Sequence, residues 1–257
     1  MFIEEHVPVM VEKMNWKPFE SILDYGCGAG SVSSHFLFPI AEKYSSAVTG
    51  VDVSPEMVEY ANENHSHALA NFLVGNIMVD DKFKWPLQNV KFDKILVVNV
   101  VHFIQDYEEF FKRIVDQLNK GGQLACGIPF AKYQRIHHNL SEHPKWRKYM
   151  GVMKKVRASW AYDDNLDFPS SVKSILESLG LKIIDFYSYE APYLFPSVNE
   201  FTDFVIATNL GAKNVPAELK KELREEIGRQ GAEIMEISPL SKPFQITSKY
   251  LRFVVEK

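Results

Sequence analysis

The chain has 257 residues, of which 46% are hydrophobic and 24% are charged, a composition typical of a globular protein with a core of its own. Its 29 Lys and Arg residues against 33 Asp and Glu residues give a net charge of -4, which disfavours general binding to nucleic acids or anionic membranes. No apolar run approaches the ~20 residues of a membrane span, and the amino terminus lacks the basic-then-apolar order of a secretory signal. We therefore expect a cytoplasmic protein with neither a nucleic-acid nor a membrane partner.

Short apolar runs alternate with amphipathic stretches along the chain. In chain order, the apolar runs predict strands at 21–25, 47–53, 71–74, 92–98, 123–128, 182–189 and 244–255. The amphipathic stretches predict helices at 31–44, 55–64, 107–118, 169–179 and 216–236. This alternation is typical of an α/β fold, with a Rossmann-like, mostly parallel sheet and helices on both of its faces.

Three segments depart from the simple alternation. The last run, 244–255, follows a charged helix and is long for a buried parallel strand, so we expect it to be antiparallel. Segments 130–165 and 191–243 leave the carboxyl ends of strands, where open α/β sheets bind ligands, and we expect both to form helical caps. Because no linker or repeat divides the sequence, we expect residues 1–257 to form a single domain.

A glycine-rich turn joins the first strand to the first helix. Gly26, Gly28 and Gly30 allow a tight turn with positive φ, leave no Cβ against a ligand and permit close helix-to-strand packing. The dinucleotide fingerprint has its third glycine one place later, where this chain has Ser31. The second strand ends in Asp52, where a carboxylate could accept hydrogen bonds from both hydroxyls of a ribose. Together the two features indicate a ligand site at the carboxyl edge of the sheet.

These residues resemble motif one and the acidic motif two of the class I S-adenosylmethionine-dependent methyltransferases, and the resemblance extends along most of the chain. It implies a seven-stranded sheet with an antiparallel last strand. It also implies the cofactor S-adenosyl-L-methionine, which leaves as S-adenosyl-L-homocysteine. Asp24 and the glycine turn would face its methionine part, and Asp52 its ribose.

The same resemblance assigns further cofactor contacts. Val53 and Met57 would face the adenine, and Asn76 with Ile77 stands where the third strand of such enzymes often ends in an acidic residue that binds the adenine amino group. Asn76 can accept a hydrogen bond there but brings no charge. Asn99, at the end of the fourth strand, would lie beside the methionine and the sulfonium.

Segments 51–62, 102–106 and 140–146 are similar to the juvenile hormone acid O-methyltransferases of arthropods, which esterify long isoprenoid carboxylic acids. In that family an amino-terminal glutamine and a tryptophan after the fourth-strand histidine hold the substrate carboxylate. The sequence begins too late to supply the glutamine, and Phe103 stands in place of the tryptophan. His102 matches the histidine, and the resemblance implies an apolar small-molecule acid as substrate.

Methyl transfer from a sulfonium is an in-line displacement, so an ionised carboxylate needs no base and positioning dominates. His102 would then donate a hydrogen bond. A neutral hydroxyl would need a base, and His102, with an unperturbed pKa of ~6.5, is the candidate catalytic residue. We predict a substrate site that includes His102, Phe103 and Trp160. Other aromatic residues of the two caps suit an apolar pocket: Trp146, Tyr162, Phe195, Phe201 and Phe204.

Other interpretations stay open. His102 could simply cap the strand end, and Asn76 and Asn99 could be ordinary turn residues. The acceptor could be another small molecule, such as a phenol, a polyprenyl quinol precursor or a tricarboxylate, and the chain could be a non-catalytic relative that binds cofactor or lipid. A nucleic-acid amino-methyltransferase is disfavoured, because its Pro-Pro-aromatic motif is missing at residues 100–102. The oligomeric state is not indicated.

The two cysteines and the histidines of the first cap segment do not predict a disulfide, a catalytic cysteine or a metal site. Cys27 and Cys126 lie in apolar or glycine-rich surroundings, so we expect reduced, buried thiols without a disulfide. Cys27 lacks the His and Asn or Asp spacing of a catalytic cysteine. His137, His138 and His143 have no CxxC or HExxH companion, so we expect solvated side chains and no metal site.

Overall fold

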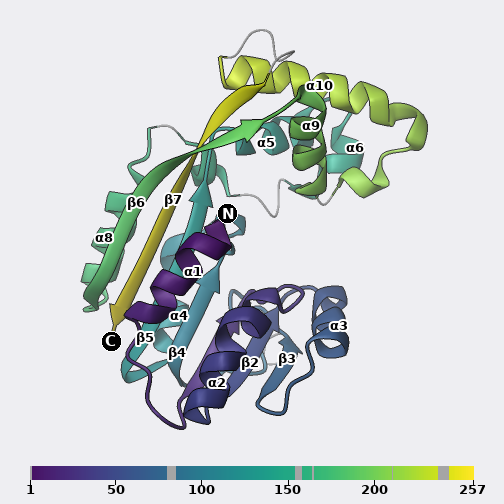
Figure 1. Cartoon of the computed structure of the whole chain (residues 1–257). Helices are drawn as coiled ribbons and strands as arrows, with labels where there is room; N and C mark the ends of the chain where they lie inside the picture. Colours follow the sequence, from purple (N-terminus) through teal and green to yellow (C-terminus); the bar gives the residue numbers. More distant parts are fainter. Residues whose placement is uncertain (1, 80–84, 154–157, 164, 210, 237–242) are drawn as a thin grey trace.

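A seven-stranded sheet with the strand order β3-β2-β1-β4-β5-β7-β6 forms the frame of the molecule (Figure 1). The computed structural model describes residues 2–79, 85–153, 158–163, 165–209, 211–236 and 243–257. The strands are β1 (Ser21–Tyr25), β2 (Ala47–Asp52), β3 (Ala70–Val74), β4 (Phe92–Val98), β5 (Leu118–Phe130), β6 (Lys182–Phe195) and β7 (Phe244–Glu256). Strands β1 to β5 pair in parallel, whereas β7 is antiparallel to both β5 and β6. The predicted sheet with an antiparallel last strand is confirmed.

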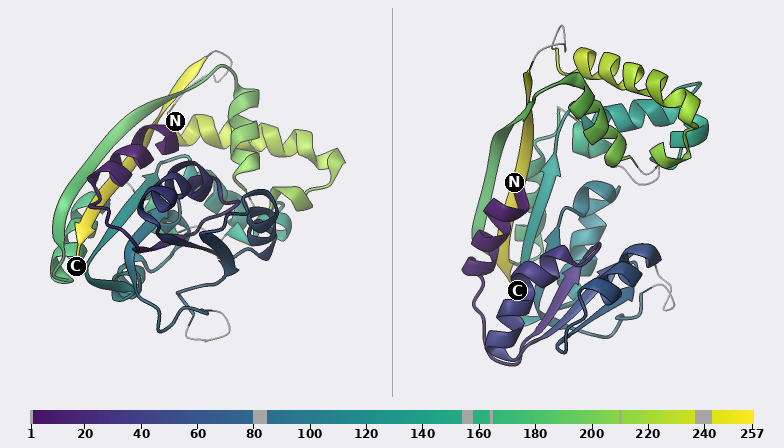
Figure 2. Two further views of the ribbon diagram at one scale, coloured as in Figure 1. Left: turned by 60° about the horizontal axis from the view of Figure 1, so that its bottom comes forward. Right: turned by 45° about the vertical axis from the view of Figure 1, so that its right-hand side comes forward.

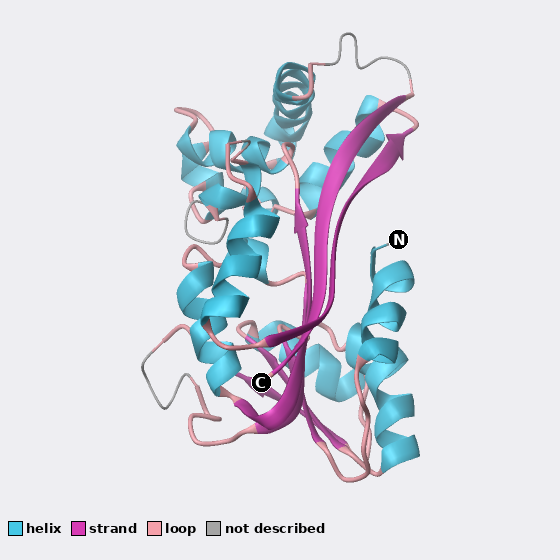
Figure 3. Ribbon diagram, turned by 90° about the vertical axis from the view of Figure 1, so that its left-hand side faces the viewer, coloured by secondary structure: helices cyan, strands magenta, loops and turns pink. Residues whose placement is uncertain are grey.

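Helices cover both faces of the sheet, as the side view of Figure 3 shows. One face carries α1 (Phe2–Lys13), α2 (Phe38–Tyr44) and α3 (Pro55–Asn64), and the other carries α4 (Tyr107–Asp116) and α8 (Phe168–Ser178). Alternate residues of the strands point to each face, so the sheet separates two apolar clusters. None of the helices in the described residues is long and apolar enough to cross a membrane.

Two helical regions differ from the sequence-based prediction. Helix α1 was not predicted, because Pro8 interrupts the helical pattern. Val7, Met10 and Val11 nevertheless bury the apolar side of this helix against the sheet. The predicted helix 31–44 contains a π-helical turn, η1 (Ser33–Leu37), before α2 begins. Such turns have no simple sequence pattern and occur often at functional sites.

The predicted start of the second cap at residue 191 is wrong. Strand β6 continues to Phe195, which pairs with Phe244 at the start of β7. The predicted strand ended at residue 189, before Pro192, but β6 is an edge strand, and an edge strand tolerates a residue that lacks a backbone N–H. The far halves of β6 and β7 thus form a two-stranded ribbon that rises beyond the rest of the sheet and leads into the cap (Figure 1).

The cap lies beyond the carboxyl ends of the parallel strands (Figure 2). It contains α5 (Gln134–Glu142), α6 (Arg147–Met150), α9 (Val198–Ala207) and α10 (Lys220–Ile234), with the short turns η3 (Ser159–Tyr162), η4 (Ala212–Asn214) and η5 (Ala217–Leu219). Residues 154–157, 164, 210 and 237–242 of the two predicted cap segments lie outside the described residues. Trp146, Phe195 and Phe201, which suited an apolar substrate pocket, are at most 3% exposed and pack in a separate core within the cap. Helices α5, α6, α9 and α10 therefore form one body with its own apolar centre, whereas Trp160 and Ala161 of η3 pack in the apolar cluster on the sheet.

Candidate active site

Strands β1, β2, β3 and β4 bring most of the predicted site residues to one edge of the sheet. β1 lies between β2 and β4, so the loops that follow these strands meet at the point where the strand order reverses. Open α/β sheets bind ligands in the crevice at this point.

The glycine turn after β1 has the predicted backbone. Gly26, Gly28 and Gly30 have φ values of 75°, 53° and 85°. A Cβ on Gly26 would lie 2.1 Å from Cγ2 of Val100, so only glycine fits against the loop after β4. A Cβ on Gly28 would meet nothing within 4 Å. The turn therefore packs tightly on one side and leaves open space over its middle residue.

Asp52, at the end of β2, is joined directly to this turn. Its Oδ2 accepts a hydrogen bond from the backbone N–H of Gly28 at 2.9 Å, and its Oδ1 accepts one from Ser54 at 2.9 Å. The carboxylate is partly buried. The two features that the sequence placed on separate strands are thus in contact, and Asp52 fixes the position of the turn.

Asp24, at the end of β1, lies beneath the turn and is 2% exposed. The hydroxyl of Ser33 donates a hydrogen bond of 2.6 Å to its Oδ2. Burial raises the pKa of Asp24 to about 6; the Ser33 hydroxyl opposes the rise, and the charge of Asp52 adds to it. Ser33 is a site residue that the sequence did not reveal, because the π-helical turn η1 places its hydroxyl against Asp24.

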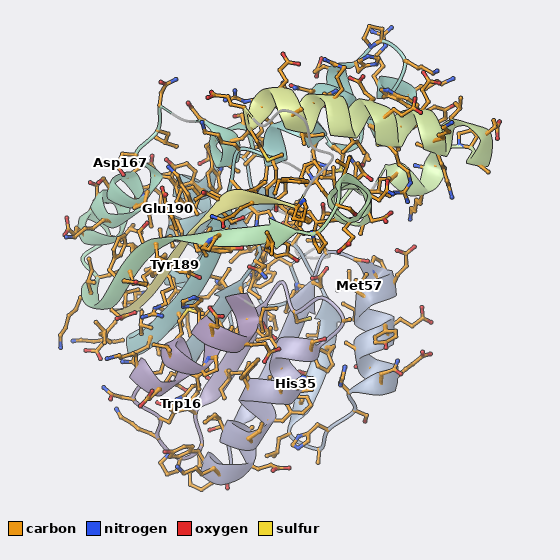
Figure 4. All side chains as sticks on the ribbon, turned by 45° about the horizontal axis from the view of Figure 1, so that its top comes forward. Trp16, His35, Met57, Asp167, Tyr189 and Glu190 are labelled. Carbon is orange, nitrogen blue, oxygen red and sulfur yellow. The ribbon has the colours of Figure 1, made fainter. Side chains whose placement is uncertain are left out.

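The loops after β2 and β3 carry the residues predicted to face an adenine. Val53 and Met57 are 59% and 46% exposed, and Met57 lies in the first turn of α3, at the end of the helix nearer to the cap (Figure 4). Asn76 accepts the N–H of Met78 through its Oδ1 at 2.9 Å. Ile77 is buried, and its N–H donates to the hydroxyl of Tyr25 at 3.3 Å. This part of the edge offers exposed apolar side chains beside an asparagine.

Asn99 directly follows β4 and has an unusual backbone conformation and an unsatisfied side-chain oxygen. Its φ of 58° is left-handed, and its N–H donates to the carbonyl of Gly127 on β5 at 2.9 Å. Its Oδ1 is buried and has no hydrogen-bond partner among the described residues. Buried acceptors are nearly always satisfied, so this oxygen is available to accept a hydrogen bond from a water molecule or a ligand.

His102 and Phe103 follow in the short turn η2 (Val101–Phe103). His102 is 6% exposed, and its ring lies 4.1 Å, centroid to centroid, from that of Phe103, which is 38% exposed. The carbonyl of His102 accepts the N–H of Ala158, so this turn is tied to the first cap segment. Trp160 is buried, donates its indole N–H to Ile104 O at 2.9 Å and stacks on Phe168. The indole of Trp160 thus supports the loop after η2, and its contact with a substrate stays a prediction.

Cys27 lies within the glycine turn, whereas Cys126 lies on β5 and the histidines of the first cap segment lie in the cap. Cys27 and Cys126 are free and buried, and burial raises the pKa of both thiols. His137 is fully buried inside the cap, where its ring contacts Thr208 and Asn209, so the prediction of a solvated side chain is wrong for it. Within the described ranges, no three His, Cys, Asp or Glu side chains are placed to hold a metal ion.

Comparisons with known proteins agree with this geometry. A family model described as a methyltransferase domain matches residues 23–126. The chain is 27% identical to the juvenile hormone acid O-methyltransferase of Bombyx mori over 232 residues, 87% of this chain and 77% of the relative. It is 30% identical to phosphoethanolamine N-methyltransferase 1 of Arabidopsis thaliana over 139 residues, 54% of this chain and 27% of that protein.

Solved structures share the fold. A putative methyltransferase from Bacillus halodurans aligns with a TM-score of 0.64 at 14% identity, over 98% of both chains. Phosphoethanolamine N-methyltransferase 2 of Haemonchus contortus, solved with S-adenosylhomocysteine, aligns with a TM-score of 0.55 at 14% identity, over 99% of this chain and 53% of that chain. The chain thus has the class I methyltransferase fold, and its residues 23–126 match a methyltransferase domain.

Proposed function

We propose that the protein transfers a methyl group to an oxygen of an apolar small molecule, an isoprenoid or fatty carboxylic acid, in the cytoplasm. The observation that carries this proposal is the extent of the match to the Bombyx mori enzyme, which covers 87% of the chain. The match to the Arabidopsis N-methyltransferase covers only 54%. An acceptor site is built largely by cap segments, so a match that includes most of the chain bears on the acceptor more than a match over half of it.

Three features of the described residues support binding of S-adenosylmethionine, the methyl donor that this function requires. The open space over Gly28, the buried carboxylate of Asp24 and the unsatisfied Oδ1 of Asn99 all lie where three loops meet. We assign Asp24, Asn99 and the glycine turn to its methionine part and Asp52 to its ribose. Four further residues complete the assignment on the adenine side: Val53, Met57, Asn76 and Ile77.

S-adenosylmethionine, when bound, supplies an electrophilic methyl group on a sulfonium. The protein's own work is to place the acceptor oxygen in line with that methyl group and to exclude water. His102, in the turn η2 that follows β4, donates a hydrogen bond to the acceptor carboxylate, and Phe103 offers an exposed apolar surface beside it. An ionised carboxylate is already a nucleophile, so no proton has to be removed.

Cofactor affinity is expected to fall at acidic pH, because Asp24 has a pKa of about 6. The α-ammonium group of the cofactor favours the ionised carboxylate. Affinity should therefore be constant above pH 7 and fall by up to about tenfold per pH unit below pH 6. Calorimetric titration with S-adenosylhomocysteine between pH 5 and 8 measures this effect. The Asp24→Asn variant should bind more weakly and lose the pH dependence; an unchanged profile in that variant would exclude Asp24 as its source.

In the cofactor-free protein, Asp24 makes the free energy of unfolding larger at acidic pH, opposite to its effect on cofactor affinity. The folded pKa of Asp24 lies above the unfolded value of about 3.9, so the folded state holds the proton more tightly. Its contribution to the free energy of unfolding is fully present below pH 4 and is lost as the pH rises through about 6. Thermal unfolding of the cofactor-free protein, compared with Asp24→Asn, should show this trend.

His102→Ala is expected to lower kcat/KM about 10- to 100-fold, because a hydrogen bond to a charged group contributes about 1.5–3 kcal/mol. A general base would contribute more, up to about 10⁴-fold, and would give a rate that falls as the histidine is protonated. Steady-state rates from pH 6 to 9 separate the two roles. A loss of kcat/KM near 10⁴-fold, together with a rate that follows the ionisation of a single histidine, would contradict the carboxylate proposal and favour a hydroxyl acceptor.

The direct test incubates the purified protein with methyl-labelled S-adenosylmethionine and a panel of isoprenoid and fatty acids. We expect a labelled product that mild base hydrolyses, as it does a methyl ester. Failure of every acid to take up base-labile label would refute the proposal. Cofactor binding without any turnover would favour the non-catalytic alternative, and turnover of a phenol, quinol precursor or tricarboxylate the alternative acceptors.

A further inference from the structure

A recess of about 450 Å³ opens in the cap between the carboxyl end of α9 and the amino end of α10. It lies at the end of α10 that is farthest from the β6–β7 ribbon (Figure 1). None of the described residues that line it belongs to the loops after β1, β2, β3 or β4. The recess is therefore separate from the proposed methyl-transfer site, and its volume lies within the range of small-molecule sites.

The inner surface of the recess is apolar. Ile206 and Ala207 come from α9, Ala212 from η4 and Leu223 from α10. Ala212 and Leu223 are 7% and 1% exposed and belong to the core of the cap. A hydrocarbon chain placed against these residues would remove apolar surface from water, which favours binding by roughly 25 cal/mol per Å².

The rim of the recess is basic. Lys213, Lys220 and Arg224 line it, and the described lining residues include no carboxylate. Arg224 is partnered, since it donates to Thr202 Oγ1 at 3.1 Å and pairs with Asp203. Lys213 and Lys220 make no hydrogen bond or ion pair with any residue in the part of the chain that the structure describes. Two ammonium groups that have no partner among the described residues, at the rim of an apolar surface, favour an acidic group in the ligand.

The remaining polar group of the recess is already satisfied. Asn209 is buried, its Nδ2 lies 3.1 Å from Nδ1 of His137, and its Oδ1 accepts the N–H of Gly211 at 2.9 Å. These bonds join α5 to the segment after α9 and hold the recess in shape. A preformed site loses little conformational entropy on binding, and its polar attraction comes from the lysines.

We propose that this recess binds an apolar molecule that carries one carboxylate, with its chain against Ile206, Ala207 and Leu223 and its carboxylate at Lys213 and Lys220. The bound acid is held away from the cofactor and is not methylated there. The site stands on the cap alone, so it does not depend on which acceptor is methylated.

The test is calorimetric titration of the cofactor-free protein with sodium dodecanoate below its micellar concentration. The double variant Lys213→Glu/Lys220→Glu should lose at least about tenfold in affinity, whereas Lys221→Glu, an exposed lysine next in sequence, should change it less than about twofold. 1-Dodecanol should bind at least about tenfold more weakly than dodecanoate. No saturable binding, equal binding of the alcohol, or equal loss in the control variant would each overturn the proposal.

A second measurement locates the ligand without relying on the double variant. A photoreactive diazirine derivative of dodecanoate should label peptides within residues 206–224. Ala207→Asp, which places a repelling carboxylate at an exposed position, should abolish that labelling. Labelling confined to the loops after β1 and β4 would overturn the proposal, and since no methyl transfer is measured, the outcome is independent of the proposed enzyme activity.

Discussion

Asp52→Ala is expected to weaken S-adenosylhomocysteine binding at least about 100-fold while the protein stays folded. The carboxylate of Asp52 holds the N–H of Gly28 at 2.9 Å and that of Ser54 at 2.9 Å, and it is the proposed acceptor for the ribose hydroxyls. Loss of hydrogen bonds to a charged group at about 1.5–3 kcal/mol each, together with a released glycine turn, accounts for this factor. Isothermal titration calorimetry measures it.

The matched control is Glu56→Ala. Glu56 has the same charge, lies four residues further on in the first turn of α3, and is exposed. It should change the affinity less than about threefold. Equal losses in both variants would mean that general electrostatics, and not the contacts of Asp52, govern cofactor binding.

The two glycine positions of the turn are expected to respond differently to alanine. At Gly26 the new Cβ would lie 2.1 Å from Val100 Cγ2 at a φ of 75°, so strain and overpacking should cost about 3 kcal/mol of unfolding free energy. At Gly28 the φ of 53° costs about 1 kcal/mol, and the Cβ points into open space. Gly28→Ala should therefore stay folded but bind cofactor at least about tenfold more weakly. Urea unfolding and calorimetry together separate the two effects.

A second substitution checks the cause at Gly26. In Gly26→Ala/Val100→Ala the two side chains no longer overlap, so the steric part of the cost should be recovered and only the left-handed strain should remain. Equal stability of the single and double variants would show that the contact with Val100 is not responsible. Full cofactor affinity in Gly28→Ala would show that the space above this residue is not a ligand site.

The sheet could be predicted from the sequence because its buried strands are short, apolar and separated by amphipathic helices. The errors fall where local rules and tertiary structure disagree. The predicted strand 182–189 stopped short of Pro192, which lies in an edge strand, and no helix was predicted around Pro8, although the apolar side chains of α1 pack on the sheet. Trp146 and Phe201 were suited to a pocket, but an aromatic side chain has the same sequence pattern whether it faces a cavity or a neighbouring helix.

The candidate site followed from the sequence to the extent that spacing fixes geometry. A turn directly after one strand and an acid at the end of the next must meet at the carboxyl edge of a parallel sheet, and Gly28 and Asp52 do so. Ser33 was missed, because a serine in a helix has no distinguishing pattern until the π-helical turn places it on Asp24. The recess near Lys213 was missed for a related reason, since it is formed by segments whose packing alone determines its shape.

The most direct test of methyl transfer to a carboxylate compares three acceptors with the same apolar chain: a carboxylic acid, the corresponding alcohol and the corresponding amine. Each is incubated with methyl-labelled S-adenosylmethionine, and the released S-adenosylhomocysteine and the base stability of the labelled product are measured together. We predict one S-adenosylhomocysteine per base-labile methyl group with the acid, and little turnover with the alcohol or the amine. Base-stable label on the amine or the alcohol, with none on the acid, would contradict it.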